Sequence, residues 1–275
     1  MLRISEKDEK DVTAFQEMHP KAKAKGFGRL FRSPTLFEDA VKTHLLCACQ
    51  WKRSLDMAKA LCDLQRDQYN VFGYSKLNRK ARKSKVLKRK RSNSVSKYNH
   101  KSLVGGNFPS PRELAALSID FLKKNCNLGY RAVLIHDLAK RVVDGTLDLD
   151  QLELDATEEE ACAEVMAFQG YGQFASATLL MCMGFYQRVP SDSETLRHLK
   201  EVHMVTISSK KKVQEETRRI YDKYAPFQCL AFWLELSDSY EKTFGKLSEL
   251  PRSLYHTVAG SINQSPQKKS SSTSG

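Results

Sequence analysis

The chain has 275 residues, 41% of them apolar, which is enough for one sizeable hydrophobic core or two small ones. No run approaches the roughly 20 uncharged apolar residues of a membrane span, and the N-terminus lacks the apolar centre of a secretory signal. Seven scattered Cys without a repeated Cys-x-x-Cys pair argue against a disulfide framework and a zinc ribbon. We therefore expect an intracellular monomer without membrane association.

The net charge of +13 is concentrated in one segment. Residues 75–101 contain twelve Lys and Arg residues and no acid, which leaves about +1 for the rest of the chain. The segment has too few apolar residues for their burial to offset the entropy cost of ordering it. We therefore expect a disordered insertion. Its densest part, Lys88-Arg89-Lys90-Arg91, suits recognition by the nuclear import machinery or a nonspecific phosphate-binding arm, and a merely solvated loop is the alternative.

The remaining chain shows helical patterns from end to end. Ser33-Pro34 precedes Glu38, and Ser110-Pro111 precedes Glu113, which predicts an N-cap and a Pro-tolerant first turn in each case. Thr157 with Glu160 predicts a capping box. Apolar residues at helical spacing follow these caps, and later segments continue the pattern at residues 131–144, 158–168, 174–185, 194–202, 213–223 and 227–241.

Alternating strand patterns are nearly absent, so the predicted fold class is all-α. We predict one helical core from residues 1–74 and 102–260. The basic insertion at 75–101 interrupts this core without dividing it. A Ser-rich tail at 261–275 has no hydrophobic period and is predicted to be disordered.

A glycine hairpin separates two of the predicted helices. Residues 169–172 read Gln-Gly-Tyr-Gly, and a helix is expected to begin near Gln173. Paired glycines permit positive φ and expose successive backbone N–H groups at a helix N-terminus, which is an anion-binding arrangement. A plain helical connection is the alternative, because Gly turns between helices are common.

An acidic residue follows the second of these helices at the start of the next. Residues 189–194 read Val-Pro-Ser-Asp-Ser-Glu, with Asp192 two positions after Pro190. The structural interpretation makes Ser191 the N-cap with Glu194 at the third helical position, and Asp192 a favourable charge at the dipole. The functional interpretation makes Asp192 a catalytic carboxylate.

The order and spacing of these motifs resemble the helix-hairpin-helix DNA glycosylase superfamily. Gly170-x-Gly172 is followed about twenty residues later by Pro190-x-Asp192. The segment at 128–132 resembles a helix start of the oxoguanine branch, and the segment at 28–38 resembles the family's entry helix. Residues 224–227, with Ala231 and Trp233 beyond them, resemble the segment that closes the base pocket. The resemblance covers most of the chain outside the insertion and the tail. It is closest to the oxoguanine and alkyladenine glycosylase branches.

The resemblance implies a base-excision repair enzyme that acts on damaged double-stranded DNA. Asp192 would stabilise the oxocarbenium-like sugar and activate water after the damaged base is flipped out of the duplex. Four residues would bind the DNA backbone: Gly170, Gly172, Gln173 and Ala175. The base-pocket candidates are Phe174, Phe227, Phe232 and Trp233, and the wedge candidates are Gln50 and Trp51. A monovalent cation, K⁺ or Na⁺, would lie on the carbonyls of Met166, Phe168 and Tyr171.

The sequence departs from the family pattern in three places. Phe174 occupies the position of the nucleophilic Lys of strand-cleaving relatives, which predicts a monofunctional enzyme without lyase activity. The C-terminal four-Cys cluster is missing, so no iron–sulfur cluster is expected. The β-domain that precedes the core in the oxoguanine and alkyladenine branches is also missing, so we expect a fragment, a short isoform or a misassigned start.

The resulting prediction is a nuclear monofunctional DNA N-glycosylase that hydrolyses the bond to a flipped damaged purine. Whether that purine is oxidised or alkylated stays open. The first alternative is a non-catalytic protein that binds the DNA backbone through the hairpin. The second is an interaction module recruited through the basic insertion.

Overall fold

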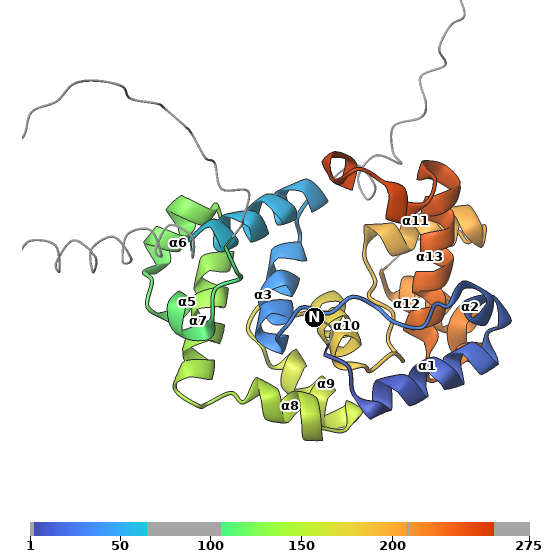
Figure 1. Ribbon diagram of the computed structural model, residues 1–275, viewed down its shortest axis with the longest axis horizontal. Coiled ribbons are helices and arrows are strands. Elements are labelled where there is room, and N and C mark those ends of the chain that lie inside the picture. Colours follow the sequence, from blue (N-terminus) through green and yellow to red (C-terminus); the bar gives the residue numbers. More distant parts are fainter. Residues whose placement is uncertain (1–2, 65–105, 208–209, 256–275) are drawn as a thin grey trace, which may run out of the picture.

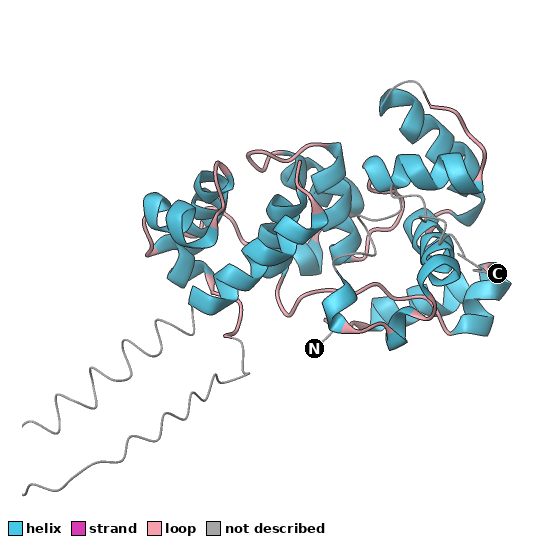
Figure 2. Ribbon diagram, turned by 90° about the horizontal axis from the view of Figure 1, so that it is seen from above, coloured by secondary structure: helices cyan, strands magenta, loops and turns pink. Residues whose placement is uncertain are grey.

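The computed structural model describes residues 3–64, 106–207 and 210–255. Within these ranges the secondary structure is helical and contains no strand, which confirms the predicted all-α class (Figure 2). The insertion at 75–101 and the tail at 261–275 lie outside the described residues, and the division of the chain stays a prediction. Besides a helix at 51–64, the helices are α1 (Glu6–Met18), α2 (Pro20–Lys25), α3 (Leu36–Leu46), α5 (Pro111–Ala115), α6 (Ile119–Cys126), α7 (Arg131–Val143), α8 (Leu149–Asp155), α9 (Glu158–Met166), α10 (Gln173–Met183), α11 (Ser193–Val202), α12 (Lys210–Tyr221) and α13 (Gln228–Phe244).

Side-chain caps fix most of the helix starts. The N-cap predicted at Ser110 and the capping box predicted at Thr157 are confirmed, and both form capping boxes with a Glu at the third helical position. The cap predicted at Ser33 is wrong, because the Thr35 hydroxyl accepts the Glu38 N–H at the start of α3. Ser33 instead donates its backbone N–H to Asp39 Oδ1 at 2.9 Å.

Two hydrophobic clusters divide the molecule into two lobes (Figure 1). The first lobe gathers α3 and α5–α9, and the second gathers α1, α2 and α11–α13. Helix α10 lies between the lobes and contributes to both cores, with Leu179 and Leu180 in the first and Met181 and Cys182 in the second. Because α10 is apolar on nearly all sides, it is buried along its length after the first turn.

The N-terminal residues join the two lobes across α10. The Arg3 guanidinium contacts Asp39 on α3 and Glu153 on α8, and it donates to the carbonyl of Cys182 on α10. Arg32 pairs with Asp8 and donates to the Tyr186 hydroxyl at 2.9 Å. Such nearly buried pairs fix the relative placement of the helices they connect. No helix among the described residues is long and apolar enough to cross a membrane.

Candidate active site

The glycine hairpin joins α9 to α10 as predicted, and its two glycines have different roles. Gly170 has φ +81°, and a Cβ there would meet Leu134 Cδ1 at 2.7 Å. Gly172 is the N-cap of α10 with an extended φ of −121°, and no atom lies within 4 Å of a Cβ built on it. Gly170 is therefore required by the turn, whereas Gly172 leaves open space in front of a helix N-terminus.

No side chain caps the start of α10. Gly172 and Gln173 are exposed, whereas Ala175 is 1% exposed. The N-terminal N–H groups of a helix need an acceptor from outside the helix when no cap provides one. The hairpin therefore presents a position where an external anion can accept hydrogen bonds from these N–H groups.

Tyr171 anchors the hairpin to α3. Its hydroxyl donates to the Ala40 carbonyl at 2.9 Å, and its ring centroid lies 4.7 Å from that of His44. Burial, together with the nearby Arg131 charge, lowers the pKa of His44 to about 4. The support beneath the hairpin therefore contains a neutral imidazole at physiological pH.

The three carbonyls predicted to hold a cation belong to the same turn. Met166 ends α9, and the Phe168 carbonyl accepts the Tyr171 N–H at 3.0 Å. Carbonyl oxygens are hard ligands with two lone pairs, so an oxygen set of this kind suits K⁺ or Na⁺ in its chemistry.

Asp192 is the N-cap of α11, with Thr195 at the third helical position. Its Oδ1 accepts the Thr195 N–H at 2.9 Å, and the Thr195 hydroxyl donates to the Pro190 carbonyl at 2.7 Å. The predicted capping box of Ser191 with Glu194 is therefore wrong by one residue. Asp192 is exposed, and its Oδ2 accepts no hydrogen bond from any residue that the structure describes. One carboxylate oxygen is held while the other faces outward.

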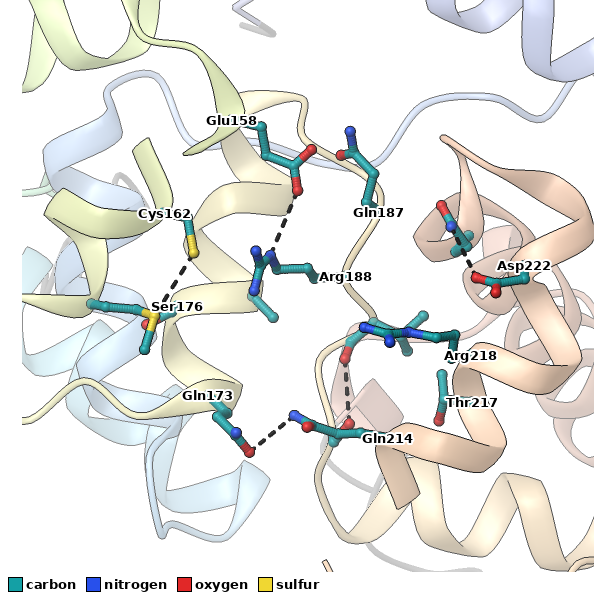
Figure 3. A pocket seen from close by; sticks show the side chains of 15 residues that line it. Glu158, Cys162, Gln173, Ser176, Gln187, Arg188, Gln214, Thr217, Arg218 and Asp222 are labelled. Carbon is teal, nitrogen blue, oxygen red and sulfur yellow. Dashed lines mark hydrogen bonds and ion pairs between the residues drawn. The ribbon is translucent and has the colours of Figure 1, made fainter. Parts of the chain in front are cut away.

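A cavity of about 340 Å³ lies between the lobes, beside both helix starts (Figure 3). Gln173, the first residue of α10, lines it on one side, and Ser191, which directly precedes Asp192, lines it on another. Asp192 itself does not line the cavity. Pockets of about 300–1,000 Å³ are typical of small-molecule sites. The wall is mostly polar, with Glu158 from α9, Arg188 from the α10–α11 loop, Gln214 and Arg218 from α12, and Asp222 and Gln228 beyond it.

Several polar groups of this cavity interact across it. Gln214 Nε2 donates to Gln173 Oε1 at 2.9 Å, which joins α12 to the start of α10 (Figure 3). Arg188 Nε lies 3.6 Å from Glu158 Oε1. Burial raises the pKa of Glu158 although the Arg188 charge opposes this shift.

Two buried acceptors line the cavity without a partner among the described residues. They are Ser176 Oγ and Gln228 Oε1, on side chains that are 4% and 8% exposed. Buried polar atoms are rarely left unpaired in native proteins. These two positions therefore offer hydrogen bonds to a molecule in the cavity.

The aromatic residues predicted for a base pocket lie in different environments. Phe227 packs edge-on against Phe15, and Phe232 packs against His198 and Tyr221 in the second core. No base could stack on either ring without displacing these neighbours. Phe174 is half-buried in the first turn of α10, and Trp233 contacts α10 through Met181, with Nε1 3.1 Å from the sulfur.

The wedge candidates border a strained turn between α3 and the helix at 51–64. Gln50 is exposed, Trp51 donates its indole N–H to the Tyr255 carbonyl at 3.1 Å, and Ala48 has φ +46°. Arg131 holds this turn by donating to the carbonyls of His44, Cys47 and Ala48. Beside Arg131, Tyr130 is 58% exposed, and the Arg131 guanidinium lies 4.6 Å from its ring centroid.

The sequence matches no protein-family model and no curated protein. Solved structures do resemble it. The Clostridium acetobutylicum 8-oxoguanine glycosylase/lyase bound to DNA with cytosine opposite 8-oxoG matches with a TM-score of 0.55 and 17% identity, over 87% of this chain and 77% of that chain. The Archaeoglobus fulgidus 3-methyladenine DNA-glycosylase matches with a TM-score of 0.54 and 19% identity, over 86% and 70%. The chain has the fold of the helix-hairpin-helix DNA glycosylases. A fold hosts many functions, so the chemistry follows from the site.

Proposed function

We propose that the chain is a monofunctional DNA N-glycosylase that removes a damaged purine from duplex DNA. One observation carries the proposal. The cavity between the lobes is bordered by Gln173 at the uncapped start of α10 and by Ser191, the residue before Asp192. An uncapped helix start therefore lines the cavity, and Asp192, whose Oδ2 has no partner among the described residues, directly follows a lining residue.

In this proposal the hairpin binds the phosphate backbone and Asp192 performs the chemistry. Cleavage of an N-glycosidic bond passes through a cationic sugar, which a fixed negative charge stabilises. Thr195 orients the Asp192 carboxylate through Oδ1, which leaves Oδ2 for the sugar or for the attacking water. The flipped base would enter the cavity, where Ser176 and Gln228 can accept hydrogen bonds from its edge.

The absence of strand cleavage rests on Phe174. A Schiff base needs an amine, and a phenylalanine in the first turn of α10 supplies none. The product would be an abasic site in an unbroken strand. The Met166, Phe168 and Tyr171 carbonyls would hold a monovalent cation that faces a phosphate, and Gln50 with Trp51 would fill the space of the flipped nucleotide.

An excision assay tests this function. The full chain is incubated with duplexes that carry one oxidised purine, one alkylated purine or no lesion. Strand breaks in the products are then measured before and after treatment with alkali. We expect strand breaks only after alkali and only for one lesion class. Binding without release of any base would instead support the non-catalytic backbone-binding protein.

We also propose nuclear localisation through Lys88–Arg91, which lies outside the described residues. The cluster consists of four consecutive basic residues, and the surrounding segment at 75–101 contains no acidic residue. A fluorescent fusion of the full chain should concentrate in the nucleus, and a variant with these four residues changed to Ala should spread into the cytoplasm. Nuclear retention of the variant would refute the signal.

A further inference from the structure

Four polar side chains of the second lobe converge on one point behind α11. His198 comes from α11, His203 from the turn that ends it, Tyr221 from the end of α12 and Glu235 from α13. His203 Nε2 lies 2.8 Å and His198 Nε2 3.2 Å from Glu235 Oε2. The Tyr221 hydroxyl lies 3.2 Å from His203 Nε2 and 3.3 Å from His198 Nε2, and it also contacts Glu235 Oε2.

We propose that His198, His203, Glu235 and Tyr221 bind one divalent transition-metal ion, with Zn²⁺ as the best-fitting ion. Two imidazole nitrogens with oxygen ligands form a donor set that Zn²⁺ accepts in tetrahedral geometry. Bonds of about 2.0–2.1 Å to a tetrahedral ion place neighbouring ligand atoms roughly 3.3 Å apart. The separations between the two imidazole nitrogens and the oxygens, 2.8–3.3 Å, come close to this value. The Tyr221 hydroxyl lies nearer than this to Glu235 Oε2 and would move away from it when the ion binds.

Three groups, His198 Nε2, His203 Nε2 and the Tyr221 hydroxyl, approach the same oxygen of Glu235. A neutral imidazole carries its proton on one ring nitrogen, so each Nε2 donates to Glu235 in one tautomer and presents a lone pair in the other. With Nδ1 protonated, both Nε2 lone pairs and the carboxylate oxygen are available to one cation.

The core of the second lobe fixes the orientation of the buried ligand. His198 is fully buried, its Nδ1 has no partner within the described chain, and its ring packs edge-on against Phe232.

An adjoining cavity of about 200 Å³ provides a path to the cluster. His203, Tyr221 and Glu235 line it, together with His19 and Asp238. The side chains of His203 and Glu235 are 21% and 35% exposed, so an ion from solution can reach their ligand atoms. The site therefore needs no unfolding of the lobe to be loaded.

The ion would cross-link helices rather than react. It would connect the end of α11 to α12 and α13, whereas Asp192 lies at the other end of α11. Six residues of helix correspond to about 9 Å between Asp192 and His198. The site would therefore hold the helix that presents Asp192 without touching the substrate.

The test uses the full chain without a polyhistidine tag, treated with chelator and then titrated with Co²⁺ and Zn²⁺. We expect one Co²⁺ per chain with the visible spectrum of a tetrahedral site and without a thiolate charge-transfer band, and displacement by Zn²⁺. With Zn²⁺ at about 100 times its Kd, Tm should rise by about 5–10 °C.

His203→Gln and Tyr221→Phe test the ligands, and His136→Gln, a half-buried histidine on α7 in the other lobe, is the matched control. His203→Gln should lose the tetrahedral spectrum and the Tm shift, Tyr221→Phe should change the spectrum, and the control should match the parent. Equal Co²⁺ binding by His203→Gln and the parent, or no tetrahedral spectrum in the parent, would overturn the proposal in favour of a metal-free hydrogen-bond cluster. The unliganded Tm of each variant shows that it folds.

Discussion

Helices α10 and α11 begin beside the same cavity, but their first turns are completed in opposite ways. The start of α10 has no side-chain cap, because Gly172 has no side chain. The start of α11 is capped by Asp192, which uses one of its two oxygens. An uncapped start invites an external anion, whereas a self-capped start holds a carboxylate in a fixed direction. Under the proposed function, the first helix start binds DNA and the second presents the reacting group, and both lie beside one cavity.

The largest expected effect is that of Asp192→Asn. Asn caps a helix about as well as Asp, so Tm should stay close to that of the parent. The lost charge should lower the rate of base excision by about 10³-fold, on the order of 4 kcal/mol in the barrier. Single-turnover excision kinetics on the preferred lesion measure the rate.

DNA affinity of this variant should be retained, because removal of a negative charge near phosphates does not weaken attraction. Excision by Asp192→Asn at the parental rate, or an adduct trapped by borohydride with the parent, would contradict the mechanism.

The second prediction concerns the supports of the two helix starts. Tyr171 at the hairpin packs against the ring of His44, which is titratable. Asp192 is held by Thr195, which in turn bonds to the Pro190 carbonyl, and neither residue is titratable. The folded-state pKa of His44 is about 4, below the ordinary value of 6.5, so the unfolded chain takes up the proton first as pH falls. The free energy of unfolding should therefore decline between pH 6.5 and 4, by on the order of 3 kcal/mol from this group.

His44→Phe keeps an aromatic ring beside Tyr171 and removes the titration. Denaturant unfolding at several pH values between 7 and 4 should show a smaller decline for this variant than for the parent. His136→Gln serves as the control, and parallel pH profiles of parent and His44→Phe would refute the assignment.

The sequence was informative where a local spacing fixes the geometry. The hairpin glycines and Asp192 follow from short motifs, and the predicted helices from 131 onward agree closely with α7 and α9–α13. The cap of α11 was displaced by one residue because Ser191 with Glu194 and Asp192 with Thr195 have the same spacing. Only packing, through the bond from Thr195 to the Pro190 carbonyl, selects the second pair.

Other features could not be predicted locally. Helix α1 buries only Phe15, so it has almost no apolar period, although Ser5 and Asp8 form a capping box. Glu158 and Arg188 meet across the cavity from elements about thirty residues apart, and no spacing rule encodes that distance. The aromatic pattern of α13 suggested a base pocket, but Phe232 faces the core.

The third prediction converts one helix start into the other. Gly172→Asp would give α10 the cap that α11 has, in open space and with an extended backbone that any residue adopts. Stability should rise by a few tenths of a kcal/mol, because Asp caps better than Gly. DNA affinity should fall about tenfold, or about 1.4 kcal/mol, because the carboxylate occupies the phosphate position and repels it.

Fluorescence anisotropy with an undamaged duplex at fixed salt measures the affinity of this variant. Gly172→Asn separates the occupied cap from the added charge and should lose less affinity. Unchanged binding by Gly172→Asp would exclude the hairpin as the backbone contact.

The smallest expected effect tests whether Asp192 acts alone. Glu158, unlike Asp192, lines the cavity, and burial raises its pKa despite the charge of Arg188. It lies on α9, outside both helix starts, and its Oε1 is already close to Arg188. A carboxylate that only positions Arg188 should matter little to the sugar cation, so Glu158→Gln should reduce the excision rate only a few-fold, less than about 1 kcal/mol in the barrier.

A general acid would behave differently: its removal would lower the rate about 10²-fold or more and would abolish the alkaline limb of the pH–rate profile. Excision rates of Glu158→Gln and Asp192→Asn across pH 5–8 distinguish these cases. Equal losses in both variants would show that the reaction needs two carboxylates and that α11 is not the sole reacting element.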